Sequence, residues 1–428
     1  MLRKLILAAA TIAVATAVVV TLSAQEKPKE ERDDQRFEVK VTDEMIRHSR
    51  IRNTLYFAGF AYSLGVLALI LFSGASRRMR DLAARVTNKK YLMAMLYIVL
   101  FTLAVTLLEF PLTYYSGYVV PHRFDLTDQT FGGWITDQAK GLGVGLVLGT
   151  LVGATALLII RKLSWWWFAL WLVSIPFLIT IIVIQPIVLD PIFNKFEPLR
   201  DQTLKRDLLD LASRAGIEGG RVYQVNKSKQ TKTMNAYVNG IGPTARIVMW
   251  DTLLAKMTHD EVLAVMGHEM GHYAMKHIWK GLAFSLALAF GVFFVGQRVH
   301  DRGLASRGAR WGFTERGDPA SVPWLLMIVS VISFFLSPIG SGYSRMIEHD
   351  ADIFSLELTH LNEPMATAFI KFAEDSKRNP TPHPFIKYWL YSHPPLGERI
   401  EFALSYKPWE QGEPNRLWTG GKKEPLLH

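Results

Sequence analysis

Seven uncharged, mostly apolar stretches constrain this chain more than any other feature. Each is near the roughly 20 residues that a helix needs to cross the hydrocarbon core of a bilayer. Half of the 428 residues are hydrophobic, which makes a purely soluble protein a poor interpretation. We therefore expect a mainly α, multi-pass membrane protein of about seven transmembrane helices, at about residues 5–24, 54–73, 91–108, 141–160, 163–189, 281–297 and 319–344.

The first of these stretches has two interpretations. It follows Arg3 and Lys4 and ends in VTLSAQ, so it also fits a secretory signal peptide with a basic start, an apolar core and small residues near its end. We favour a retained helix, and cleavage after residue 24 is the alternative.

The polar segments between the stretches divide the chain into five parts. Two of them are polar and long enough to fold outside the membrane, although neither is large, so an adequate core requires them to pack together. The parts are a signal-like or first transmembrane helix with a charged segment (1–53), transmembrane helices with polar loops (54–189), a first folded region (190–280), a transmembrane hairpin (281–344) and a second folded region (345–428).

The formal net charge of +10 indicates a lipid partner rather than nucleic acid. No basic run is interleaved with aromatic residues, and most charges flank the apolar stretches, where they set topology and meet lipid headgroups. The chain contains no cysteine, which excludes structural disulfides and thiolate metal ligands.

The segment VLAVMGHEMGHYAMKH, residues 262–277, carries the pattern H-E-x-x-H. Thr258 and Glu261 have the spacing of a capping box, so a helix is expected to begin there. His268 and His272 are one helical turn apart, and their imidazoles can reach one tetrahedral zinc ion. A buried helix that carries this pattern by chance is the alternative.

Glu269 follows the first of these histidines. On a helix it lies beside the open position of such an ion rather than on it. That position suits a general base which takes a proton from an attacking water. A metal site without hydrolysis has no need of this residue.

A third ligand must come from elsewhere, and the best candidate is in SRMIEHDADIFSLEL. Glu348 and Asp352 are four residues apart and share one helix face, so Glu348 can bind zinc while Asp352 holds a ligand histidine. Seen alone, the segment also fits a solvated acidic helix start.

Two further stretches offer substrate contacts. TMNAYVNGIGPTARIVMWDTLL is typical of a β-hairpin whose first strand could be an edge open to an extended peptide, with Asn235 offering its amide. His393 precedes two prolines that make the backbone rigid, which suits a histidine that stabilises an oxyanion. An ordinary hairpin and a solvent-facing histidine are the alternatives.

Six stretches together, in their order and spacing, resemble the integral-membrane CAAX prenyl endopeptidases. The resemblance runs from about residue 40 to 405 and implies a gluzincin-like zinc metalloprotease domain with a small β-hairpin or sheet, built onto seven helices around a large water-filled chamber. The stretches are VLDPIFNKFEPL, SKQTKTMNAYVNGIG, RIVMWDTLL, EVLAVMGHEMGHYAMKH, SRMIEHDAD and SHPPLGERI.

The resemblance also implies a role for each matched position. By it, one Zn²⁺ per chain is held by His268, His272 and Glu348, and Glu269 is the catalytic glutamate. The other matches are Asn235 and His393 as residues near the scissile bond, Asp352 as the acid behind a ligand, and Arg399 as a positive charge near the site.

The expected function is a zinc-dependent membrane endopeptidase whose partners are the lipid bilayer and a peptide or protein substrate, lipidated in the CAAX case. A quality-control protease of unprenylated membrane proteins is the first alternative. A metal-binding membrane or transport protein without catalysis is an alternative of another class.

Two arguments disagree on the side of the membrane that the site faces. Counted over the short loops of the seven-span scheme, Lys and Arg are more numerous on the side opposite the site, which places the site away from the cytoplasm. The resemblance implies the cytoplasmic face instead.

Overall fold

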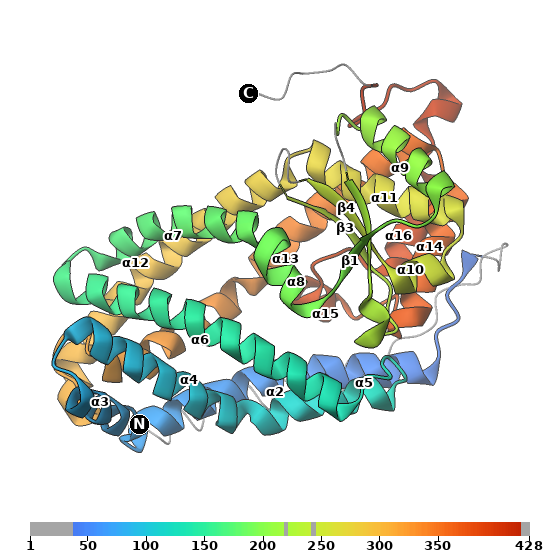
Figure 1. The fold of residues 1–428 in the computed structure, drawn as a ribbon. Coiled ribbons are helices and arrows are strands. Elements are labelled where there is room, and N and C mark those ends of the chain that lie inside the picture. Colours follow the sequence, from blue (N-terminus) through green and yellow to red (C-terminus); the bar gives the residue numbers. More distant parts are fainter. Residues whose placement is uncertain (1–36, 218–220, 241–244, 421–428) are drawn as a thin grey trace.

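The computed structural model describes residues 37–217, 221–240 and 245–420. Long helices run side by side and form an elongated bundle, and a small sheet with shorter helices closes one end of it (Figure 1). The first expected span, residues 5–24, lies outside the described residues.

Six helices of the described chain are long and apolar enough to cross a membrane. They confirm the other six expected stretches, and several extend well beyond them. Their helical cores are α2 (Asp43–Phe72), α4 (Lys90–Tyr114), α6 (Phe131–Lys162), α7 (Trp166–Ile184), α12 (His277–Trp311) and α13 (Val322–Thr359).

The prolines in residues 109–134 favour an irregular, partly buried loop over another helix, and this prediction from the sequence is wrong for residues 109–123. The helix continues through a π-helical turn, η2 (Tyr115–Val119), into α5 (Val120–Arg123). A π turn absorbs the hydrogen bond that a proline cannot make. Tyr114 and Tyr118 stack one turn apart at 5.5 Å, which stabilises the extension. The same arrangement follows α7, where the helix continues through the π-helical turn η3 (Gln185–Leu189) into α8 (Asp190–Phe193).

The connections from α2 to α4, from α6 to α7 and from α12 to α13 lie at the end of the bundle away from the sheet (Figure 1). One contains α3 (Ala75–Val86), which packs on α4. The Oγ of Ser76 donates a hydrogen bond to the carbonyl of Ala320 at 2.9 Å and also lies 2.7 Å from the hydroxyl of Tyr97. These contacts fix α3 to the turn between α12 and α13.

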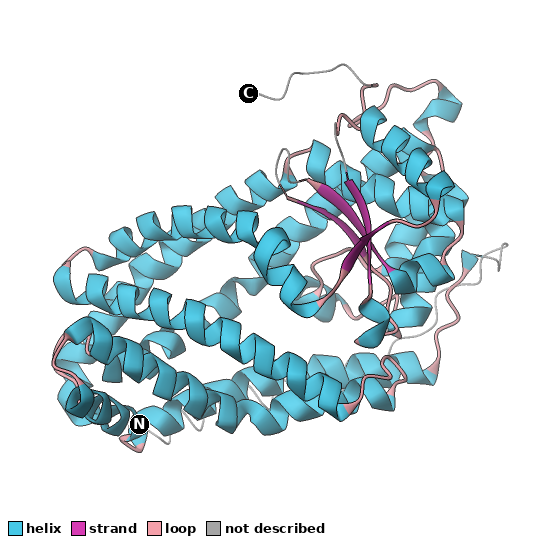
Figure 2. Cartoon of the chain, in the orientation of Figure 1, coloured by secondary structure: helices cyan, strands magenta, loops and turns pink. Residues whose placement is uncertain are grey.

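The sheet has four strands in the order β1-β2-β4-β3 (Figure 2). The expected hairpin is present as antiparallel β3 (Ala236–Asn239) and β4 (Arg246–Trp250), and β3 is an edge strand as expected. The sequence analysis did not foresee β1 (Phe196–Pro198) or β2 (Arg221–Val225). β2 pairs in parallel with β4, Val222 opposite Ile247, and β1 pairs antiparallel with β2.

One hydrophobic core joins residues that precede α12 to the last turns of α13. It includes Leu208, Met249 and Met266 from the first group and Phe354 and Leu358 from α13. The surrounding helices are α9 (Gln202–Arg214), α10 (Asp251–Lys256), α11 (His259–Ala274), α14 (Asn362–Ser376), α15 (Pro384–Leu390) and α16 (Leu396–Ser405). The part of the chain that the structure describes also contains the short 3₁₀ helices η4 (Lys227–Lys229), η6 (Pro319–Ser321) and η7 (Pro408–Gln411).

Candidate metal centre and active site

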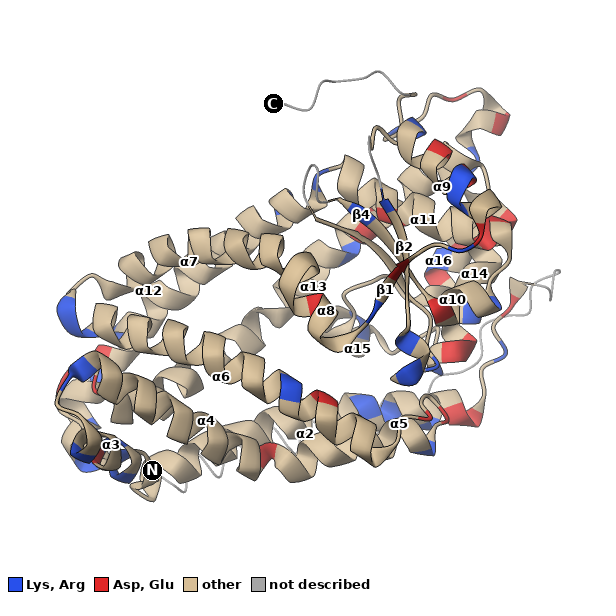
Figure 3. Cartoon of the chain, viewed as in Figure 1, with Lys and Arg blue, Asp and Glu red and all other residues tan. Residues whose placement is uncertain are grey.

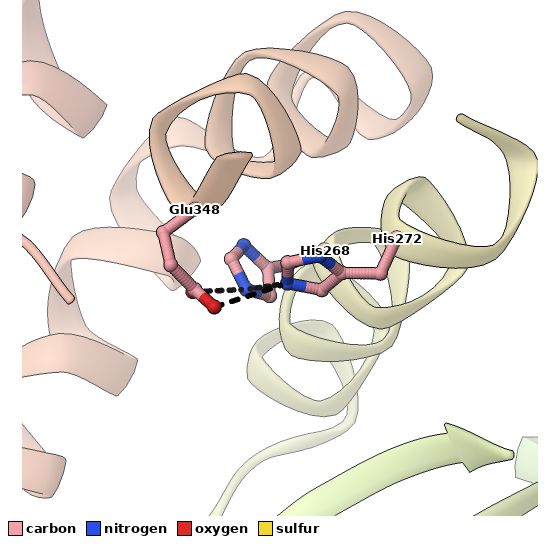
Figure 4. A group of neighbouring side chains, drawn as sticks. All are labelled: His268, His272 and Glu348. Atoms are coloured by element: carbon pink, nitrogen blue, oxygen red, sulfur yellow. Dashed lines mark hydrogen bonds and ion pairs between the residues drawn. The ribbon is translucent and has the colours of Figure 1, made fainter. Parts of the chain in front are cut away.

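The helix that carries the H-E-x-x-H pattern begins where its capping box predicts. The backbone N–H of Glu261 donates to Thr258 Oγ1 at 3.4 Å, and the backbone N–H of Thr258 donates to the Glu261 carboxylate at 2.7 Å. With its start fixed, α11 turns His268 and His272 toward Glu348 of α13 (Figure 4).

Three ligand atoms from these residues converge on one point. His268 Nε2 lies 3.1 Å from His272 Nε2 and 3.2 Å from Glu348 Oε2. Glu348 Oε1 lies 3.5 Å from His272 Nε2. One ligand atom from each residue fits within a 4.8 Å group, and both His268 and Glu348 are buried.

The surroundings of this point fit a cation. Glu348 Oε2 is buried and makes no hydrogen bond, an arrangement that a bound ion would satisfy. Burial disfavours a charged imidazolium, yet the carboxylates of Asp352 and Glu348 outweigh burial and raise the pKa of His268 to about 10. The site thus stabilises positive charge, and two imidazoles with one carboxylate are ligands that zinc accepts.

Asp352 and Arg399 lie behind the first histidine. Asp352 Oδ1 is 2.8 Å from His268 Nδ1, which turns the lone pair of Nε2 toward the metal point. Arg399 donates two hydrogen bonds to the same carboxylate, from Nε at 2.9 Å and from Nη2 at 2.6 Å. The structure thus places Arg399 against Asp352, with its guanidinium also 4.1 Å from the ring of Phe369.

The sequence analysis missed His277. Its Nδ1 lies 2.9 Å from Nδ1 of His272, so it stands behind the second histidine as Asp352 stands behind the first. No helical period could have found it, because α11 ends at Ala274 and Lys276 turns the chain at a φ of 57° before α12 begins. The only signal was a third histidine close after the motif.

Glu269 lies on the same helix between the two histidines, and it is not one of the three residues whose ligand atoms converge. Removal of the carboxyl from water raises its pKa, while the neighbouring histidines act in the opposite direction. A raised pKa brings a carboxylate closer to the working range of a general base.

The two expected substrate residues are placed differently. His393, in the loop before α16, has its Nε2 3.3 Å from Glu348 Oε2, so it lies beside the metal point and is half exposed. Asn235 is exposed at the start of the edge strand β3, and its Oδ1 accepts a hydrogen bond from the following backbone N–H at 2.9 Å. β3 packs against α11, which places the open edge next to the motif helix.

Two glycines let α11 and α13 approach closely. A Cβ on Gly267 would lie 2.7 Å from Ser355 Oγ and 3.1 Å from Thr359 Cγ2, and one on Gly271 would lie 3.0 Å from the Phe354 ring. Ser355 Oγ donates to the carbonyl of Ala264 at 2.7 Å, which ties the two helices together. The face of α11 that carries these two glycines therefore lets α13 approach closely enough for Glu348 to reach the histidines.

Comparisons with known proteins agree with this geometry. Residues 198–407 match the model of peptidase family M48. Residues 24–195 match the CAAX prenyl protease N-terminal model, described as five membrane helices. The metalloprotease YhfN of Bacillus subtilis, which is described as uncharacterized, is 34% identical over 83% of this chain and 84% of its own. The chain belongs to peptidase family M48.

Further relatives extend the match over the membrane part. CAAX prenyl protease 1 of Saccharomyces cerevisiae is 30% identical over 70% of this chain and 69% of its own. The crystal structure of S. mikatae Ste24p shares the fold, with a TM-score of 0.78 at 24% identity over 94% of this chain and 97% of that one. The M48 chain is thus an integral membrane metalloendopeptidase, and the resemblance seen in the sequence is confirmed.

Proposed function

We propose that this M48 peptidase uses one Zn²⁺ per chain, held by His268, His272 and Glu348, to hydrolyse peptide bonds next to the bilayer. The observation that carries the proposal is the convergence of three ligand atoms beside Glu269. Nitrogen and carboxylate donors without thiolates are typical of catalytic zinc sites, which keep one position open.

The residues around the site divide the work of hydrolysis. A bound zinc ion supplies Lewis acidity to the scissile carbonyl and lowers the pKa of water. Glu269 takes the proton from the attacking water and later delivers it to the leaving amine. His393 donates a hydrogen bond to the developing oxyanion. Asp352, backed by Arg399, keeps His268 in the tautomer that presents Nε2.

The edge strand supplies a place for the substrate backbone. β3 is free along its outer side in the order β1-β2-β4-β3, so an extended peptide can add to it as a further strand. Asn235 stands at the beginning of this edge and would hold one peptide group. In this proposal residues 190–280 and 345–428 form one catalytic unit around α11 and α13, and 54–189 and 281–344 hold it in the membrane.

The substrate class that we propose is a protein with a lipidated C-terminal motif of the CAAX type. Support comes from the names of the relatives, which include CAAX prenyl protease 1 of yeast and its human homologue. The relative YhfN is named only as a metalloprotease, so unlipidated membrane proteins are the competing class. Nucleic acid has no place in either version.

Cleavage of matched peptides by the purified protein tests the proposal. Each peptide is offered with and without a farnesyl group, before chelation, after chelation and after zinc is restored, with Glu269→Gln as the inactive control. We expect chelation to abolish cleavage, zinc to restore it, and the farnesylated peptide to be preferred. Equal cleavage of both peptides would replace the lipidated substrate with the unlipidated class. Bound zinc without any cleavage would reject the peptidase role.

A further inference from the structure

Two arginines near the metal centre have no acidic partner. Arg52 is partly buried on α2, near the end of the bundle that the catalytic unit closes, where Figure 3 shows a group of blue residues on this helix. Arg378 is exposed in the loop that follows α14. Within the part of the chain that the structure describes, neither side chain forms an ion pair or a hydrogen bond, and the charge that acts on Arg52 is that of Arg378. A partly buried cation without a counter-charge is costly, so we expect an anion from outside the chain at this point.

The acidic residues beside this pair of arginines are already used by lysines. Lys377 Nζ lies 2.8 Å from Glu44 Oε1. Lys256 forms an ion pair with Asp375 in the last turn of α14. The two arginines therefore keep their charge for another partner.

The loop after α14 is fixed to α2, so the pair of arginines is held in place before any ligand binds. His48 donates from Nδ1 to the carbonyl of Lys377 at 2.9 Å, and the backbone N–H of Asn379 donates to Ser49 Oγ at 2.9 Å. His48, Ser49 and Arg52 are three or four residues apart on α2 and share one face of the helix. These contacts keep Arg52 beside the loop.

The pair lies where the C-terminal side of a bound substrate would run. Arg378 is within electrostatic range of His393, which lies beside the metal point. The backbone N–H of Met234, just before β3, donates to Asp375 Oδ2 at 3.0 Å, three residues before Arg378. A peptide that adds antiparallel to β3 runs with its C-terminus toward the beginning of that strand. Its end therefore approaches the loop that carries Arg378.

We propose that Arg52 and Arg378 form a subsite for the free C-terminal carboxylate of the substrate. Guanidinium groups are the side chains best suited to bind a carboxylate, because they donate paired hydrogen bonds. In a CAAX motif three residues follow the lipidated cysteine, so the carboxylate lies roughly 10 Å beyond it along an extended chain. The subsite rests on the proposed peptidase function and deepens it, since the end of the substrate chain becomes a determinant of specificity beside the lipid.

Peptides that differ only at the C-terminus test the subsite. One farnesylated CAAX peptide is prepared with a free carboxylate, with a C-terminal amide, and with two further residues after its last one. Binding of each is measured by fluorescence anisotropy on the zinc-loaded full chain carrying Glu269→Gln, because binding does not require turnover. Arg52→Gln and Arg378→Gln are added to this parent protein one at a time, and Arg50→Gln, at an exposed position on the same helix, is the matched control.

We expect the parent protein to bind the free carboxylate roughly 10 to 100-fold more tightly than the amide or the extended peptide, as for hydrogen bonds between charged groups. Arg52→Gln and Arg378→Gln should each lose most of this preference, and the loss should fall on the peptide with the free carboxylate. Arg50→Gln should retain the preference. In turnover by the chain with Glu269 intact, the same loss should appear as a raised KM.

Two results would overturn the subsite. The first is equal binding of the free carboxylate and the amide by the parent protein. The second is an equal loss for all three peptides in the arginine variants, which would assign the two arginines to folding or to lipid headgroups. Cleavage without any preference for the free carboxylate would reject the subsite and leave the peptidase function standing. A binding preference without any cleavage would support the subsite and reject the peptidase function.

Discussion

Two helix pairs of this protein are built in opposite ways. α11 and α13 touch through Gly267, where an added methyl would collide, and through Gly271, where it would be tightly packed, and the two helices enclose a buried set of charges. α7 and α12 meet through rings such as Trp167 and Phe290 at 5.0 Å, and only 6% of the most apolar part of each is buried in protein. Protein covers little of the second pair, as expected of helices that face lipid.

The difference shows where a membrane enzyme can place chemistry. Catalytic groups need supports that lock their geometry, and such supports come from dense packing and satisfied polar contacts. A lipid-covered pair supplies neither, although it tolerates the loose packing well. The substitutions below separate these two kinds of helix contact, from the largest expected effect to the smallest.

Removal of the α13 ligand should have the greatest effect. We expect Glu348→Ala to lose most of its metal and all measurable peptidase activity, because two imidazoles bind zinc far more weakly than three protein ligands. Metal content per chain, measured by elemental analysis after purification, checks this. Full occupancy would mean that the contact between α11 and α13 does not build the metal centre.

Glu269→Gln should abolish activity while the metal stays. Loss of a general base costs roughly 10² to 10⁴-fold in rate, and the amide cannot accept the proton. Turnover and metal content measured on the same sample separate this variant from Glu348→Ala. Retained turnover would remove Glu269 from the mechanism.

Asp352→Asn should have a milder effect, on the order of 10 to 100-fold in metal affinity or activity, as for other residues that orient a ligand. Asp350→Asn is the matched control, since residues two apart do not share a helix face. A chelator competition assay on both variants measures the affinity. Equal affinities would show that the contact between Asp352 and His268 is dispensable.

A pair of glycine substitutions tests the comparison itself. Gly267→Ala should cost about 1 to 3 kcal/mol of stability, because its Cβ would meet Ser355 Oγ at 2.7 Å in a packed contact. Gly291→Ala on α12 has open space around its Cβ and should stabilise the helix by up to about 1 kcal/mol. Melting temperatures of both variants in the same detergent are the measurement. Equal shifts would show that the α11–α13 and α7–α12 contacts do not differ in packing.

The smallest effect is expected at the start of α11, and it depends on pH. Burial favours the protonated form of Glu261, but hydrogen bonds from Lys371 at 2.6 Å and from the backbone of Thr258 outweigh it and lower the pKa. A lowered carboxyl pKa stabilises the fold above the unfolded value near 4.3, and this stability is lost as the pH falls through the folded pKa.

Glu261→Gln should therefore lower the melting temperature at pH 7 by the equivalent of about 0.5 to 2 kcal/mol, the range for a lost cap. The gap to the wild type should narrow below pH 4. If the difference in melting temperature between Glu261→Gln and the wild type stays constant down to acid pH, the loss of stability does not come from the charge of Glu261.

The sequence predicted the parts of the site that depend on local helix geometry. His268, Glu269 and His272 follow from spacing on one helix, and Glu348 with Asp352 from spacing on another. The structure brings Arg399 to Asp352, whereas the sequence offered only the resemblance for this residue. His277 was missed because a left-handed residue at Lys276 changes the chain direction between the two histidines.

The fold was also predictable where it depends on local sequence patterns. The length of the apolar stretches predicted the six described spans, and the turn residues predicted the β3–β4 hairpin. β1 has only three residues, and β2 pairs in parallel with β4 across the strand β3 that intervenes in the sequence, so neither pairing leaves a local pattern. The helical extension after α4 was hidden because its prolines suggested a loop, while aromatic stacking and a π turn preserved the helix.

The uninterrupted course of α13 makes the metal centre sensitive to bilayer thickness. This helix has 38 residues, so it is roughly 57 Å long at 1.5 Å per residue, and its apolar part and Glu348 belong to one rod. When the hydrocarbon layer is thinner or thicker than a span, the helix adjusts by tilting. Because α11 is packed against α13 through Gly267 and Gly271, a tilt of α13 carries the whole metal centre with it and changes its distance from the bilayer surface. We therefore expect peptidase activity to depend on acyl-chain length, which a comparison of short-chain and long-chain lipid nanodiscs would measure.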